Sequence, residues 1–255
     1  MIEFFFFVAL FFLIAVVFYK QRRDDLQILQ MEYDQMADQF SDLLEEQQPL
    51  VIRGVPQPKG VTQESLKKIP RLAEFAVGGQ PLSSILESPA MLSSGNGLPV
   101  LNDLNSEALA TELSIPVWAN KLWKKPLADS FWFGSTLGTL KTGVVLGGLG
   151  LFRTSAYATL FLPTENTYKV SILSRDSEDF LPASWEYRYI SSFTTNDTPL
   201  VSELKYLDIV VRPGTALSLP RHSVVSIEPS NFDIFSAAIL LEYHLPVSLL
   251  VKSFS

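Results

Sequence analysis

The chain has two histidines, His222 and His244, and they are its first candidates for metal chemistry. A site at His222 would need His244, or a carboxylate such as Asp208 or Glu228, as its second ligand. The two imidazoles lie 22 residues apart, without the short spacings that are typical of metal sites. The pattern favours one loop histidine and one histidine packed at a strand end over a metal site.

Nucleophilic and phosphate-binding motifs are equally weak. Residues 134–138 (GSTLG) carry threonine where a nucleophile elbow carries serine. The glycines of residues 143–150 match neither a phosphate loop nor a dinucleotide fingerprint, and they indicate tight backbone turns instead. Because the chain has no cysteine, a thiolate nucleophile and a cysteine-ligated zinc are excluded.

One short segment combines aromatic and basic side chains: Trp118, Lys121, Trp123, Lys124 and Lys125. Such a cluster could hold a carbohydrate, an anionic lipid headgroup or an acidic partner, since tryptophan offers area and lysine offers charge. The alternative, which we favour, has the tryptophans facing the core and the lysines in water between them.

Composition limits the remaining classes. A chain of 255 residues with 47% apolar residues can bury a core as one large domain or two small ones. The net charge of −7 opposes binding to nucleic acid, which depends on clustered basic residues.

The N-terminus predicts a membrane anchor. Residues 4–19 are 16 consecutive uncharged residues, most of them large and apolar, so we expect residues 1–20 to cross a bilayer and residues 2–19 to contact lipid. A cleaved signal peptide is the alternative, but Glu3 and the lack of a small-residue cleavage pattern oppose it. The basic residues at 20–23 predict a single-pass protein whose C-terminal domain faces the cytosol or, in a virus, lies on an internal membrane of the virion.

Residues 21–48 follow as an expected amphipathic connecting helix. Apolar residues recur there at spacings of three and four, while acidic residues cover the other face. The apolar positions are Leu26, Leu29, Tyr33, Met36, Phe40 and Leu43. The stripe packs either on the chain's own domain or, as a short coiled coil over residues 26–43, against a second copy.

Residues 49–255 are expected to form one domain that is mainly β with flanking helices. Strand-like runs alternate with turn residues, which predicts a sandwich or a double-stranded β-helix barrel. A short strand is expected in residues 49–56 (PLVIRGVP), where Gly54 and Pro56 stop it. The other expected strands are 131–133, 142–146, 156–162, 168–173, 185–190, 207–212, 216–219, 224–227 and 234–243. Pro213 and Gly214 predict a type II turn between two of these strands, because proline presets its φ and glycine accepts a positive one.

Several segments, in this order, carry a family resemblance: PLVIRGVP, SEALATELSIPVW, FWFGSTLGTLKTGVVLGG, TYKVSIL and LDIVVRPGTALSLPRHSVVSIEP. Together they resemble the landmarks of the JmjC-type (jumonji-like) cupins, which are 2-oxoglutarate oxygenases, over roughly residues 50–251. The resemblance implies a cupin or jelly-roll barrel in which two histidines and a carboxylate hold iron.

Transferred residue by residue, the resemblance places Val145 and Val225 at the two histidine positions and Gly147 at the carboxylate position. Neither valine nor glycine has a side-chain donor, so we expect no iron, no cofactor and no enzyme activity. Lys169 lies near the position of the family's 2-oxoglutarate lysine, although the exposed end of a strand explains it more simply.

The sequence therefore predicts a membrane-anchored, non-catalytic cupin-like protein that acts as a structural or protein-interaction module. One alternative is a minor structural protein that joins capsid to membrane in a large membrane-containing virus. Others are a binder of a small ligand, such as a sugar or lipid, in the emptied pocket, and a residual enzyme using His222. A ligand-sized cavity would favour the small-ligand binder, and a pocket plugged by large side chains would favour the interaction module.

Overall fold

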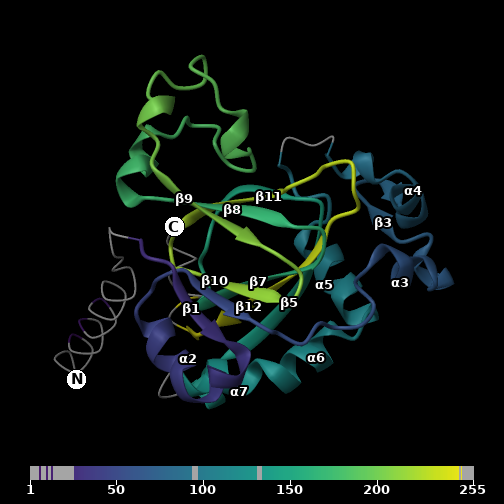
Figure 1. The fold of residues 1–255 in the computed structure, drawn as a ribbon, viewed down its shortest axis with the longest axis horizontal. Coiled ribbons are helices and arrows are strands. Elements are labelled where there is room, and N and C mark those ends of the chain that lie inside the picture. Colours follow the sequence, from purple (N-terminus) through teal and green to yellow (C-terminus); the bar gives the residue numbers. More distant parts are fainter. Residues whose placement is uncertain are drawn as a thin grey trace.

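The computed structural model describes residues 26–93, 97–130, 134–246 and 248, together with Phe6, Leu10 and Leu13. Two β-sheets face each other, and helices cover the outer face of the larger sheet. Figure 1 shows these layers, with α2, α6 and α7 on the side of the larger sheet that faces away from β8, β9 and β11.

The strands divide between the sheets so that consecutive strands often lie in different layers. The larger sheet has the order β1 (Leu29–Glu32), β2 (Leu50–Arg53), β10 (Thr215–Leu219), β7 (Ala158–Glu165), β12 (Ala237–His244), β5 (Thr139–Leu146). The smaller sheet has the order β6 (Leu149–Arg153), β11 (Val224–Pro229), β8 (Tyr168–Leu173), β9 (Tyr206–Val211). A third, two-stranded sheet pairs β3 (Ala76–Val77) with β4 (Gln80–Pro81).

Successive side chains of the inner strands point to opposite faces of the larger sheet and so enter two separate cores. On β12, Ile239 and Leu241 face the cluster shared with the helices, whereas Ala238 faces the cluster between the two sheets. On β7, Leu160 and Phe161 divide in the same way. Because successive strand side chains point to opposite faces, a strand buried on both faces reads as a continuous apolar run.

The expected helix over residues 21–48 is partly wrong. Leu29–Glu32 is strand β1, which pairs in parallel with β2, and α2 is confined to Met36–Glu45. Backbone pairing with β2 overrides the helical spacing, and Met31, which did not belong to the predicted apolar stripe, is 4% exposed. Met36 and Phe40 pack into the helix-side core as the stripe predicts.

The expected barrel is also wrong. The fold mixes helix and sheet, and no sheet in the described part of the chain closes into a barrel, because β1 and β5 are the edges of one sheet and β6 and β9 the edges of the other. Further helices lie in the region before β5. They are α3 (Gln63–Lys67), α4 (Leu82–Glu87), α5 (Asp103–Glu112), α6 (Ile115–Leu122), α7 (Lys124–Asp129) and α8 (Gly134–Leu137).

The expected single-pass membrane location is corrected as well. Among the described residues, no helix is both long enough and apolar enough to cross a bilayer. The α-helices α2 and α5 have 10 residues each, or about 15 Å of length against roughly 30 Å of hydrocarbon. The predicted span at residues 2–19 lies outside the described residues, except for Phe6, Leu10 and Leu13.

The turn at Pro213 and Gly214 forms where the sequence predicts it. The Thr215 amide donates to the Arg212 carbonyl at 3.0 Å, and Gly214 has a φ of 88°. This turn joins β9 to β10 and so carries the chain from the smaller sheet to the larger one. The expected strand at residues 185–190 is instead part of a long insert, residues 174–205, that connects β8 to β9 with short 3-10 turns.

Candidate ligand-binding cleft

The positions matched to iron ligands lie close to the space between the sheets. Val145 on β5 and Val225 on β11 belong to the same apolar cluster and are 7% and 0% exposed. Gly147 follows β5 with a φ of 73°, and an added Cβ would meet the Leu92 carbonyl at 3.1 Å. None of the three side chains can donate to a metal, so these positions do not fit the iron that the resemblance implies.

Large side chains fill the interior beside these positions. Phe161 on β7 meets the ring of Tyr168 on β8 edge to face, with 5.1 Å between centroids. The Tyr168 hydroxyl donates to the Gly147 carbonyl at 3.0 Å. Burial raises the pKa of this phenol well above its ordinary value, so it stays a neutral donor. The middle of the sandwich is therefore packed rather than hollow.

A cleft of about 650 Å³ opens beside this packed region. We call it the β5–β6 cleft. Its walls come from α5, β5, β6, β12, the turn at His222 and a segment of the insert. The residues that line it include Asp103, Glu107, Lys141, Val145, Leu149, Leu151, Phe152, Arg153, Trp185, Glu186, Tyr187, His222, Leu240 and Glu242.

Strand alternation explains the floor of the cleft. Lys141 and Val145 leave the same face of β5, and Leu240 and Glu242 leave the adjacent face of β12. In the register of the sheet, Glu242 lies directly opposite Lys141. The floor therefore changes from apolar at Val145 and Leu240 to charged at Lys141 and Glu242.

Both cations in the cleft have carboxylate partners. The Lys141 ammonium lies 3.6 Å from a Glu107 carboxylate oxygen on α5. The Arg153 guanidinium lies 2.8 Å from a carboxylate oxygen of Glu178 and also donates to the His222 carbonyl at 3.2 Å. The Lys141–Glu107 pair is exposed to water and therefore adds little stability, whereas the Glu178 side chain of the second pair is only 17% exposed. Both pairs compensate charge in the cleft.

The two histidines do not come together as a metal site. His222 sits in the turn before β11 with a φ of 55°, and its amide donates to the Thr154 carbonyl at 3.0 Å. His244 is buried at the end of β12, where its Nε2 lies 3.3 Å from a Glu242 carboxylate oxygen. No group of three metal-ligating side chains occurs among the residues that the structure describes.

The aromatic and basic cluster divides between core and solvent. Trp123 is 0% exposed and packs edge to face against Tyr33 and Phe40, with centroids 6.4 and 6.3 Å away. Trp118 packs against the same core. The lysine side chains at 121, 124 and 125 are exposed. Both tryptophans thus pack on the core, with Trp118 only partly buried, and the three lysines face solvent.

Lys169 is held on the outer face of the smaller sheet, away from the cleft. Its ammonium lies 3.1 Å from Asp208 and 5.9 Å from the centre of the Tyr206 ring. Burial alone would lower the pKa of Lys169, but the hydrogen bond and charge of Asp208, with Glu228 adding to them, raise it above its ordinary value. The strand-end role is thus the simpler reading of this lysine.

The insert supplies one lip of the cleft, Trp185–Tyr187, and anchors it to β6. The Leu151 amide donates to the Arg188 carbonyl at 2.8 Å, and the Tyr187 amide donates to the Leu151 carbonyl at 2.8 Å. A Cβ at Gly150 would collide with the Tyr187 backbone, so glycine permits this close approach.

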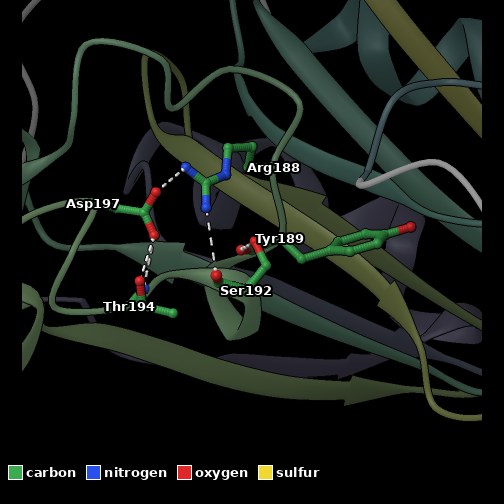
Figure 2. Close-up of polar contacts among 5 residues, drawn as sticks. All are labelled: Arg188, Tyr189, Ser192, Thr194 and Asp197. Atoms are coloured by element: carbon green, nitrogen blue, oxygen red, sulfur yellow. Dashed lines mark hydrogen bonds and ion pairs between the residues drawn. The ribbon is translucent and has the colours of Figure 1, made fainter.

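A salt bridge braces the segment behind the lip. Figure 2 shows the Arg188 guanidinium directed at Asp197, 2.7 Å from its carboxylate. The Thr194 amide and hydroxyl donate to the second oxygen of that carboxylate at 3.0 and 2.9 Å. The Arg188 hydrogen bond, with the two Thr194 donors, holds the pKa of Asp197 far below its usual range. The neighbouring Tyr189 phenol has its pKa raised to about 12 by burial and by the charge of Glu228.

Part of this cleft is predictable from the sequence. Val145 and His222, which are candidates from the sequence alone, line the wall, whereas Gly147, Val225 and the Trp118–Lys125 cluster do not. Asp103, Glu186 and Glu242 are not predictable as site residues, since single carboxylates on separate elements form no motif.

Comparison with known proteins adds no identification. No protein family matches the chain, and no curated protein matches it. Among solved structures, Drosophila melanogaster CENP-C bound to CAL1 shows 13% identity and a TM-score of 0.25, covering 39% of this chain and 62% of that chain. A likeness at that score carries no argument, so the JmjC-type resemblance stays a prediction.

Proposed function

We propose that this chain is a non-catalytic ligand-binding domain that resembles the JmjC-type cupins in the order of its landmarks. The observation that carries the proposal is the β5–β6 cleft of about 650 Å³, which has Val145 in its wall. Small-ligand sites usually occupy roughly 300–1,000 Å³ and combine apolar walls with a few polar groups. The cleft has that size and that mixture of side chains.

Blocking the cleft tests ligand binding. In Leu240→Trp a larger side chain enters from the floor, and Val210→Trp places the same side chain on the solvent face of β9, where Val210 is 60% exposed. A fragment library is screened by ligand-observed NMR against the chain and both variants. We expect hits that bind the chain and Val210→Trp but not Leu240→Trp. A library without any such hit would contradict the proposal.

A second experiment tests the absence of catalysis. The purified chain is supplied with ferrous iron and 2-oxoglutarate, and succinate is measured along with bound iron after dialysis. With Val145, Gly147 and Val225 at the ligand positions, we expect no succinate above a protein-free control and far less than one iron per chain. Succinate formation that His222→Ala abolishes would contradict the non-catalytic assignment.

A protein-interaction module is the second candidate. The space between the sheets is plugged by Phe161 and Tyr168, which favours this module over a ligand site at the positions matched to iron ligands, and edge strand β9 favours it as well. Among the described strands, β9 is hydrogen-bonded only to β8, and Val210 and Tyr206 on it are 60% and 44% exposed. An open edge with apolar side chains can pair with a strand of another protein. Partners captured by the chain but not by Val210→Asp would support this function, whereas equal capture by both would contradict it.

A further inference from the structure

The charges of the β5–β6 cleft select the kind of ligand. Four carboxylates and two cations line it, and the cations Lys141 and Arg153 are already paired with Glu107 and Glu178. The other carboxylates of the wall are those of Asp103, Glu186 and Glu242, and Glu242 also lies 3.3 Å from His244 Nε2, so the wall carries more carboxylates than cations. Like charges that line a concave surface focus the electrostatic field and attract the opposite charge. The cleft therefore favours a cationic ligand over an anionic one.

The aromatic side chains of the cleft also favour a cationic ligand. Trp185 and Tyr187 flank Glu186 on the lip, and Phe152 lines the wall on β6. The face of an aromatic ring attracts ammonium and guanidinium groups, with tryptophan the strongest. Aliphatic side chains complete the walls with Val145, Leu149, Leu151 and Leu240. A ligand that matches this lining carries its positive charge on an apolar body.

The lip is held in place before any ligand arrives. Its backbone pairs with Leu151, and Gly150 lets Tyr187 approach β6 closely. The Arg188–Asp197 salt bridge braces the chain directly behind it. A site fixed in advance loses less conformational entropy on binding, so a small ligand with few contacts can bind there.

From these features we propose that the cleft binds a small organic cation, an ammonium or guanidinium group on an apolar body. The inference rests on the proposed ligand-binding function and names its ligand class. The volume of about 650 Å³ suits one compact molecule, and the wall residues come from α5, the two sheets and the lip, which surround that volume on several sides.

Three probes of nearly equal shape test the proposal: phenylbutylamine as the cation, phenylbutanol as the neutral analogue and phenylbutyrate as the anion. Their dissociation constants are measured by titration NMR near neutral pH at low salt. We expect the amine to bind at least tenfold more tightly than the alcohol, and the acid to bind most weakly. The double variant Glu186→Gln and Glu242→Gln should remove this preference and leave the affinity for the alcohol unchanged.

Two controls keep the outcomes separate. Glu74→Gln, which removes an exposed carboxylate outside the cleft, should leave the preference intact. Leu240→Trp should abolish binding of all three probes.

If the alcohol or the acid binds as tightly as the amine and Leu240→Trp blocks it, the cation inference is wrong while the ligand-binding function stands. If no probe and no library fragment binds, the ligand-binding function itself is wrong. A lysine-containing peptide that binds where the amine does not would also overturn the inference.

Discussion

Gly214 holds a backbone conformation that β-branched residues rarely adopt. Its φ is 88°, and an added Cβ would meet no atom within 4 Å, so a larger side chain would strain the backbone without a steric clash. We expect Gly214→Val to lower the free energy of unfolding by roughly 1–3 kcal/mol. Gly214→Asn should cost less, because asparagine tolerates positive φ. Equal midpoints for the valine and asparagine variants in denaturant titrations would contradict this account.

Asp197 makes the stability of the chain depend on pH. Its pKa is lowered in the folded state by Arg188 and Thr194, so its contribution is present above the unfolded pKa of about 3.9 and is lost as the pH falls toward the folded value. Asp197→Asn should therefore be less stable than the native chain at pH 7, and the gap should narrow at pH 3. Denaturant titrations at both pH values measure it, with the exposed Asp179→Asn as the control. A gap that does not change with pH would rule out this linkage.

The apolar face of helix α2 is buried within its own domain. Phe40 is 1% exposed and packs against Trp123 with ring centroids 6.3 Å apart. Phe40→Ala should lower the free energy of unfolding by about 3–5 kcal/mol, the usual cost of deleting a buried phenyl ring. Gln39→Ala, on the exposed face, should change it by less than about 0.5 kcal/mol. Thermal and denaturant unfolding measure both variants, and a small effect at Phe40 would mean that this face is not buried.

In the same segment, the spacing of apolar residues does not predict the observed secondary structure. Apolar residues recur at helical spacings over residues 29–43. Leu29–Glu32 is nevertheless a strand, because β2 offers it a parallel backbone partner. An oligomer through residues 26–43 stays a prediction, although Met36 and Phe40 already pack within the domain.

Across the whole molecule, stability should be distributed from the centre of the sheets outward. Strands β7 and β12 each have a paired strand on both sides in the larger sheet and are largely buried on both faces, whereas β1 and β9 are edge strands. Local opening exposes edges first, so amides of β7 and β12 should exchange with solvent most slowly and those of β1 and β9 fastest. Hydrogen exchange followed by mass spectrometry tests this order. Fast exchange throughout β12 would contradict the three-layer arrangement.

Features that depend on residue type and near neighbours can be predicted from the amino-acid sequence. The turn at Pro213 and Gly214 could be predicted because φ preferences are local, and most strands after residue 139 could be predicted from their apolar runs. The lack of metal donors at positions 145, 147 and 225 is likewise a matter of side-chain chemistry, whatever the fold. The separation of core tryptophans from solvated lysines near Trp123 followed from the same kind of reasoning.

The sheet edges and the cleft depend on contacts between distant segments of the chain. Whether two sheets stay open or close into a barrel depends on hydrogen bonds between strands far apart in the chain, and no local pattern specifies them. The cleft gathers Asp103 from α5, Glu186 from the insert and Glu242 from β12, which lie more than a hundred residues apart from first to last. Side chains so distant in sequence form a site only because the packing of the sheets, helix and insert brings them to one surface.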